Sequence, residues 1–147
     1  MKPLINWGPL QKKRNMARST RQRDAIQSVI DSAQRPLSPQ EILDDAKIHV
    51  AGIGMATIYR NLKSLVESNS LVVVTLPGES ARYESAGHTH HHHFHCTGCD
   101  KVFDVHQCPG KMLNLAPNGF TVERHELTLY GKCDTCSEQP TAPEPNR

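Results

Sequence analysis

Two Cys-x-x-Cys pairs constrain the fold of this 147-residue chain more than any other feature. They are "CTGC" at residues 96–99 and "CDTC" at residues 133–136, with 33 residues between them. Each pair can hold a cation through two thiolates across a tight turn, and two pairs make the four-sulfur tetrahedron typical of structural zinc. Because the gap is longer than in a compact zinc ribbon, a small sheet must bring the pairs together. We therefore predict a structural Zn(II) site, rather than two redox motifs or coincidental thiols, formed by Cys96, Cys99, Cys133 and Cys136.

The run "HTHHHHFHC" leads directly into the first pair, and its last six residues are predicted to form a strand. Side chains alternate between the two faces of a strand, so His91, His93 and His95 share one face. Two carboxylates could join this face: Asp104 on the return strand "KVFDV", and Glu84 at the end of an earlier hairpin. Imidazoles combined with carboxylates suit iron, zinc, manganese or nickel. The alternative interpretation is a flexible histidine-rich loop that binds metal weakly.

The opposite face of the same strand carries His90 and His92, which could meet His125 of "TVERHELTLYG" in a further site. The fifth cysteine, Cys108 in "HQCPG", belongs to neither Cys-x-x-Cys pair. We interpret Cys108 as a loop thiol packed as a small apolar side chain, with a redox or metal role as the lesser alternative.

The first half of the chain is predicted to form three helices and a hairpin. Thr20 is expected to cap the first helix, and Ser38 caps the second, where Pro39 and Glu41 complete a capping box. The third helix, "MATIYRNLKSLVES", has a buried stripe made by Ile58, Leu62, Leu65 and Val66. The hairpin "LVVVTLPGESARYE" turns at a Pro-Gly pair. This order is that of a winged helix-turn-helix, whose third helix enters the major groove of DNA.

Basic side chains gather at two places in this half. Arg60 and Lys63 lie on the outer side of the third helix, and Tyr59 flanks them. Six more basic residues fall within residues 12–23: Lys12, Lys13, Arg14, Arg18, Arg21 and Arg23. Both places could attract phosphate backbones. A helix face of this kind is more often simply solvated, and a solvated basic tail explains the N-terminal cluster nearly as well.

The composition allows only a modest core, since 37% of residues are hydrophobic and 5% are aromatic, and a metal would help to stabilise it. The sequence shows neither a signal peptide nor a run of about eighteen apolar residues, so we expect a cytoplasmic protein without a membrane partner. In a reducing compartment the cysteines point to metal ligation or redox chemistry rather than to a disulfide framework. The expected segments are a disordered basic N-terminus (1–15), a winged-helix DNA-binding domain (16–80), a dimerisation and metal-sensing domain (81–136) and a disordered tail (137–147).

The segments "GMATIYRNLKSL", "RYE", "HHHFHCTGCDKVFDV" and "HELTLYGKCDTC" resemble, in order and spacing, the ferric uptake regulator (Fur) family over about residues 16–136. The resemblance implies an α+β fold, with an N-terminal winged helix-turn-helix followed by a small α/β dimerisation and metal-binding domain. It also implies a homodimeric, metal-dependent repressor of metal homeostasis genes that binds a palindromic double-stranded DNA operator and no small-molecule substrate. Fe(II) is the expected regulatory metal, with Zn(II) as the nearest alternative and Mn(II) as a further one. A zinc-responsive or peroxide-sensing regulator of the same family is the alternative function.

The resemblance assigns residues to each site. It agrees with the four cysteines as structural zinc ligands. The implied regulatory ligands, near the hinge between domains, are Glu84, His91, His93 and Asp104. A further metal site of some members corresponds to His90, His92 and His125. The implied DNA contacts are Arg18, Thr57, Tyr59 and Arg60.

The chain departs from the family pattern at two places. Members commonly supply a regulatory histidine shortly before the second helix, where this chain has Arg35. The regulatory site would then either have fewer ligands or be completed by a water or by another histidine, such as His88 or His95. The carboxylate that some members add to the further site is not evident either, and His106 or Cys108 are the candidate substitutes.

Other classes of function remain open on the residues alone. A histidine-rich metal-storage protein would bind metal through the same imidazoles, but Tyr59 and Arg60 would have no role in it. An enzyme with a catalytic zinc and Glu123 or Glu126 as its base is the more distant alternative, since no nucleophile motif accompanies it. Oxidation of the cysteine pairs with loss of zinc is a further behaviour open to the chain.

Overall fold

A computed structural model describes residues 8–110 and 112–137 of the chain, and the predictions for residues 1–7 and 138–147 lie outside this part. The chain divides into two compact units, Met1–Ala86 and Gly87–Arg147. The domain boundary expected between residues 80 and 81 therefore differs from the division after Ala86, because a strand that follows residue 81 pairs within the first unit. Each unit is described by itself below.

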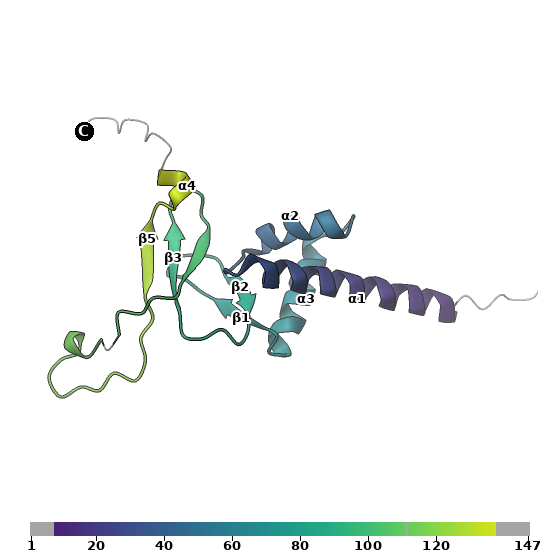
Figure 1. The fold of residues 1–147 in the computed structure, drawn as a ribbon. Helices are drawn as coiled ribbons and strands as arrows, with labels where there is room; N and C mark the ends of the chain where they lie inside the picture. The colour runs from purple at the N-terminus through teal and green to yellow at the C-terminus, as the bar shows by residue number, and fades with distance from the viewer. Residues whose placement is uncertain (1–7, 111, 138–147) are drawn as a thin grey trace, which may run out of the picture. The chain divides into compact units, whose positions relative to one another are not determined.

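The first unit contains three helices and a two-stranded hairpin, in the predicted order (Figure 1). The helices are α1 (Gly8–Ala33), α2 (Pro39–His49) and α3 (Met55–Glu67), and the strands are β1 (Leu71–Val74) and β2 (Arg82–Ser85). Residues Ile58, Leu62 and Leu65 of the predicted stripe on α3 are buried. They pack in one core with apolar side chains of all three helices, of β1 and of the segment between α1 and α2, among them Ile26, Ile30, Leu37, Ile42 and Leu71.

Helix α1 begins at Gly8, so the prediction that Thr20 caps it is wrong. Thr20 lies inside the helix, and its hydroxyl donates to the carbonyl oxygen of Met16 at 3.0 Å. The residues that follow Pro9 are mainly good helix formers. The helix can therefore begin well before the buried apolar residues of its C-terminal half. The helix consequently extends into the segment 1–15 for which composition predicts disorder.

Helix α2 begins as predicted at the capping box. Ser38 Oγ accepts a hydrogen bond from the backbone N–H of Glu41 at 3.3 Å, and the Glu41 carboxylate accepts one from the Ser38 N–H at 2.9 Å. Pro39 occupies the first helical position, where its missing N–H costs nothing. This start is therefore determined by local chemistry.

The hairpin forms the wing of the first unit. β1 and β2 are antiparallel, with Leu71 opposite Ser85 and Val74 opposite Arg82. Gly78 adopts a φ of 78° after Pro77, the position where a tight turn requires a left-handed residue. Two backbone hydrogen bonds of 2.8 and 2.9 Å between Leu37 and Tyr83 attach β2 to the segment between α1 and α2. These bonds attach the wing to the chain just before α2.

The second unit is a three-stranded sheet with strand order β4-β3-β5 (Figure 1). β3 (His92–Cys96) is antiparallel to β4 (Val102–Val105) and parallel to β5 (Thr128–Gly131). The 3₁₀ helix η1 (Met112–Leu115) lies between β4 and β5, and the short helix α4 (Asp134–Ser137) follows β5. Because Cys96 pairs with Gly131, the parallel register brings the chain just before "CDTC" beside "CTGC". This is the small sheet that the cysteine spacing requires.

Together the two units give the predicted α+β architecture of a winged helix-turn-helix followed by a small second domain. Among the described residues, no helix combines the length and the apolar character that crossing a membrane demands.

Candidate metal centres and recognition helix

The four predicted zinc ligands come together at one end of the sheet of the second unit. The Sγ atoms of Cys96, Cys99, Cys133 and Cys136 all lie within 4.8 Å of one another. Cys99 Sγ and Cys133 Sγ are 3.9 Å apart. Zinc–sulfur bonds of about 2.3 Å in a tetrahedron place two sulfurs about 3.8 Å apart. The cysteine cluster therefore has the size of a four-sulfur zinc site.

Close packing inside this cysteine cluster depends on Gly98. A Cβ atom at this position would lie 2.9 Å from both Cβ and Sγ of Cys136, closer than such atoms approach in proteins. The turn around Gly98 is closed by the N–H of Asp100, which donates to the carbonyl of Cys96 at 2.9 Å. Glycine is thus required here because the second cysteine pair packs directly on the first turn.

The electrostatics of the cysteine cluster favour a cation. The backbone N–H of Cys133 donates to Cys96 Sγ at 3.2 Å and is the main cause that lowers the pKa of Cys96 to about 6. The hydrogen bond with the Cys133 thiol is the main cause that raises the pKa of Cys136 to about 12, and burial adds to it. One thiol is therefore held ready as a thiolate, while ionising all four needs a compensating positive charge.

A second cluster lies on the face of the β3–β4 pair that carries His93 and Asp104. His93 and Asp104 are register partners across the two strands. The nearer oxygen of Asp104 is 3.8 Å from His91 Nε2 and 4.0 Å from His93 Nε2, and its carboxylate is buried. The structure therefore brings three of the four predicted regulatory ligands together. Glu84 is buried in β2 of the first unit, and its membership of this regulatory set stays a prediction.

The two histidines considered as additional ligands differ in their surroundings. His88 Nδ1 lies 3.7 Å from the second oxygen of Asp104, beside the regulatory set. His95 is buried near the other end of β3, where its Nε2 pairs with Asp100 at 2.7 Å. His88 is therefore the histidine that the fold of the second unit brings to the regulatory set.

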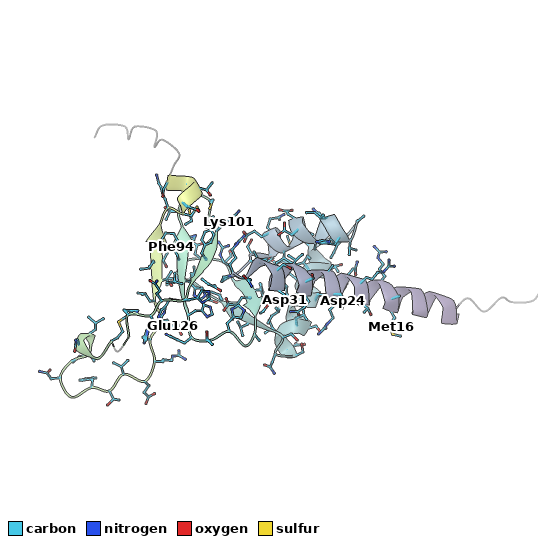
Figure 2. All side chains as sticks on the ribbon, in the orientation of Figure 1. Met16, Asp24, Asp31, Phe94, Lys101 and Glu126 are labelled. Carbon is cyan, nitrogen blue, oxygen red and sulfur yellow. The ribbon has the colours of Figure 1, made fainter. Side chains whose placement is uncertain are left out.

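A third cluster forms on the opposite face of β3, as the alternation of side chains predicts. His125 Nε2 lies 3.3 Å from Nε2 of both His90 and His92. Burial, and repulsion from His90 and His125, lower the pKa of His92, which keeps its imidazole neutral and able to bind metal. Figure 2 marks Phe94 within β3 and Glu126, which follows His125 in the segment before β5.

Cys108 also belongs to this third cluster, and the interpretation of Cys108 as a packed apolar side chain is wrong. The thiol is exposed, and its Sγ lies 3.2 Å from His125 Nε2. Cys108 is also one of the two substitutes, with His106, that the departure from the family pattern suggests for the further site, and the structure places Cys108 in the group with His90, His92 and His125. Its neighbour in space comes from a segment 17 positions later in the chain, which the sequence does not show.

The predicted recognition helix presents its polar residues outward. Tyr59 is 52% exposed and Arg60 is exposed, while Thr57 is partly buried and its hydroxyl accepts from Arg60 at 3.4 Å. Asn61 holds the inner side of the helix by donating to the Thr57 carbonyl at 2.8 Å. Arg18 is exposed on α1 of the same unit. These four predicted DNA contacts are all described, and their roles stay predictions.

Arg35 has a structural partner in place of a metal. Its guanidinium donates to Glu41 Oε1 at 2.7 Å, and the buried guanidinium of Arg82 donates to Glu41 Oε2 at 3.3 Å. Burial tends to raise the pKa of Glu41, but the hydrogen bonds from Arg35 and Ser38 and the charge of Arg35 outweigh it, so the pKa is lowered. Glu41 thus joins the start of α2 both to Arg35 and to Arg82 of the wing.

Comparison with known proteins gives a consistent result. The sequence model described as "Ferric uptake regulator family" matches residues 14–130. The zinc uptake regulation protein of Mycobacterium tuberculosis is 32% identical over 123 residues, which cover 81% of this chain and 94% of that protein. The peroxide operon regulator of Bacillus subtilis is 29% identical over 126 residues, covering 83% and 86%. The structure of the Helicobacter pylori ferric uptake regulator, described as having three functional metal binding sites, shares the fold with a TM-score of 0.63 at 22% identity, covering 96% of this chain and all of that one.

Proposed function

The chain belongs to the ferric uptake regulator family of transcriptional regulators, and on this premise we propose that it represses metal homeostasis genes when its regulatory site holds metal. Family regulators bind DNA and form dimers. We propose that this chain acts as a homodimer on a palindromic operator, because two copies of one recognition helix read two inverted half-sites. The observation that carries the metal dependence is the regulatory set, a buried carboxylate between two imidazoles in a sheet that already holds a separate cysteine cluster.

The cysteine cluster is proposed as the structural zinc site. Its dimensions, its four thiols and the tight turn at Gly98 suit tetrahedral Zn(II) and leave no position open for a substrate. Zinc bound there would join β3 to α4 and hold the sheet together, which matters because few of the apolar residues that the structure describes in this unit are buried. Its role is therefore in folding rather than in sensing.

The regulatory set is proposed to bind the sensed metal through His91, His93 and Asp104, with Glu84 from the first unit. His88 is proposed as the additional ligand that stands in for the histidine absent at Arg35, because His88 lies beside Asp104 while Arg35 is paired with Glu41. Imidazole and carboxylate ligands in this ratio suit Fe(II), which we propose as the regulatory metal. Zn(II) is the second candidate, favoured by the large share of histidine and by the similarity to a zinc uptake regulator.

Coupling between metal and DNA is proposed to be a population shift. A metal held by ligands of both units would favour one arrangement of the units, and this arrangement would set the distance between the recognition helices of the dimer. The metal can shift the population only because it binds more tightly to the arrangement that binds DNA. To change the ratio of this arrangement to the other from 1:99 to 99:1, the metal must bind it about 10⁴-fold more tightly. On the DNA, Thr57, Tyr59 and Arg60 are proposed to contact the major groove and Arg18 the minor groove.

The test is DNA binding as a function of metal. The purified dimer, with zinc retained in the cysteine cluster, is loaded in turn with Fe(II), Zn(II), Mn(II) or Ni(II). Metal-loaded protein first selects its operator from a random DNA pool, and fluorescence anisotropy then measures affinity for this operator. We expect one metal to raise the affinity for the operator by at least about 100-fold. This metal should act at a lower free concentration than each of the other three needs for the same effect. If no metal changes the affinity for any selected DNA, the protein is not a metal-dependent regulator, and metal storage becomes the better explanation.

A further inference from the structure

Arg23 is one of the basic residues that the sequence groups as candidate phosphate contacts, but the structure gives it partners within the fold. Its side chain is half-buried, and its guanidinium donates to Ser64 Oγ at 2.8 Å and to Ser68 Oγ at 3.4 Å. Ser64 lies in the last turn of α3, and Ser68 caps this helix. We propose that Arg23 is a positioning residue for operator recognition, which holds the C-terminal end of α3 against α1. The consequence for DNA rests on the proposed function, whereas the contact itself belongs to the first unit alone.

The place of Arg23 on α1 explains why its side chain turns inward. Arg23 precedes the buried Ile26 by three positions and the buried Ile30 by seven, and these spacings put side chains on the same side of a helix. Arg21 is exposed, and so is Arg18 one turn earlier. Arg23 therefore lies at the edge of the packed face of α1, where its side chain reaches α3, while Arg18 and Arg21 remain open to a phosphate.

The end of α3 carries a set of hydrogen bonds that Arg23 extends. The N–H of Ser70 donates to the Leu65 carbonyl at 2.9 Å, and Asn69 before it has a left-handed φ of 56°, as in a Schellman motif. The Ser68 hydroxyl donates to the same Leu65 carbonyl at 3.1 Å. Because its single proton is used there, the Ser68 oxygen is free to accept from Arg23. The guanidinium thus stands at the head of a chain of donors that ends on a helix carbonyl, and each bond polarises the next.

Helix α3 also lacks its own charges at this end. The last carbonyls of a helix carry partial negative charge, which a nearby cation stabilises. No basic residue lies in the last turn of α3, and its N-terminal cap, Gly54, makes no side-chain hydrogen bond. Arg23 supplies the missing cation from another helix. The orientation of α3 therefore depends on α1 more than that of α2 does, since α2 has a complete capping box.

This contact sets the distance between two groups of proposed DNA contacts. Arg18, proposed for the minor groove, lies five positions before Arg23 on the same helix, about 7.5 Å along its axis. The proposed major-groove contacts lie on α3. Base contacts need both groups in register, whereas phosphate contacts tolerate a tilt of one helix because they carry no sequence information. Loss of the Arg23 contact should consequently weaken binding to the operator more than binding to unrelated DNA.

The experiment compares two labelled DNAs by fluorescence anisotropy, the operator selected by the metal-loaded dimer and a shuffled DNA of the same length. Arg23→Met, which keeps the length of the side chain but removes its donors, should bind the operator at least about tenfold more weakly and the shuffled DNA within about twofold of the wild type. The salt dependence of operator binding should stay unchanged. Lys47→Met makes a comparable loss of charge at an exposed position of α2 and is the matched control, which should keep the ratio of the two affinities.

A second variant separates positioning from phosphate binding. Ser64→Ala keeps the charge of Arg23 but removes its shorter hydrogen bond, so it should also weaken operator binding. Combined with Arg23→Met it should add little, because both changes break one contact. A phosphate contact of Arg23 would give the opposite pattern. Arg23→Met would then weaken binding to both DNAs and lower the salt dependence by about one ion, and Ser64→Ala would bind as the wild type; this result would overturn the proposal.

Hydrogen exchange without DNA tests the contact independently of the proposed function. In Arg23→Met the Ser70 N–H should exchange at least about tenfold faster than in the wild type. The Leu37 N–H, which is bonded to Tyr83 in the wing, should keep its rate and so exclude a general loss of the fold. If Arg23→Met does not fold, Ser64→Ala carries the same measurement. Unchanged exchange at Ser70 would overturn the contact, whereas a wild type that selects no operator would overturn the proposed function and leave the exchange result standing.

Discussion

Arg35 lies 2.7 Å from Glu41, so the residue that stands where the resemblance to the family would place a regulatory histidine is held in an ion pair. The same carboxylate accepts from the buried Arg82 at 3.3 Å and caps α2 through the Ser38 N–H. One side chain thus joins the start of α2, the segment before it and the wing. The metal response that we propose therefore relies on ligands other than residue 35.

Glu41→Gln should lower the free energy of unfolding of the first unit by about 1–3 kcal/mol at neutral pH, because it removes the charge between two guanidinium groups. Glutamine can still close the capping box, so the variant isolates the charge from the cap. Urea denaturation monitored by circular dichroism measures the change. Glu67→Gln, which removes an exposed partner of Lys63, is the control and should change stability by less than about 0.5 kcal/mol.

The same ion pair predicts a dependence of stability on pH. The pKa of Glu41 is lowered in the folded state from its ordinary value of 4.5, so its contribution is complete above pH 4.5 and is lost as the pH falls through the folded pKa. The stability difference between the wild type and Glu41→Gln should therefore shrink in this acid range. A difference that stays constant down to the acid transition would show that the charge is not its source.

Cys96→Ser and His93→Ala should separate the structural site from the regulatory set. Cys96→Ser should lose bound zinc, measured by mass spectrometry of the metal, and the second unit should unfold because four thiolates hold its end together. His93→Ala should keep zinc and the folded dimer but lose metal-dependent DNA binding. If both variants unfold alike, the division of roles between the two clusters is wrong.

Gly98→Ala should weaken zinc binding, because the added methyl group would lie 2.9 Å from Cys136 Sγ. Competition with a chromophoric chelator should show at least about tenfold faster loss of zinc, the size of effect typical of disturbed metal ligands. Gly54→Ala adds a methyl group where no atom lies within 4 Å and is the matched control. Equal zinc retention in both variants would contradict the packing argument.

His88→Ala should raise the metal concentration for half-maximal operator binding by about 10–100-fold, if His88 completes the regulatory set in place of residue 35. His49→Ala, on the exposed last turn of α2, removes the same kind of side chain away from the cluster and should leave the response unchanged. An unchanged response in His88→Ala would leave the regulatory metal with His91, His93 and the carboxylates alone.

Arg60→Ala should weaken operator binding about tenfold without changing the metal content, since one exposed charge of the recognition helix is removed. Lys47→Ala removes the same charge from an exposed position on α2 and should have a much smaller effect. Affinities measured at several salt concentrations distinguish a phosphate contact, which lowers the salt dependence, from a contact to a base. If Arg60→Ala binds as tightly as the wild type, α3 does not recognise the operator through this residue.

Local chemistry made much of this protein predictable from its sequence. The capping box at Ser38 and the Pro-Gly turn depend on residues at most a few positions apart, and both are present. The alternation of side chains in a strand likewise separated His91 and His93 from His90 and His92 before the partners were known. Two Cys-x-x-Cys pairs required a sheet between them because one tetrahedral ion must contact both.

Tertiary structure alone decided which distant groups meet. Cys108 reaches His125 only because β4 and β5 flank the same central strand, and His88 reaches Asp104 across the other face. The second partner of Glu41, Arg82, likewise comes from the wing, 41 positions later in the chain. Sequence periodicity describes which face a side chain occupies. What lies opposite that face depends on strand order and register, which form only when the chain closes on itself.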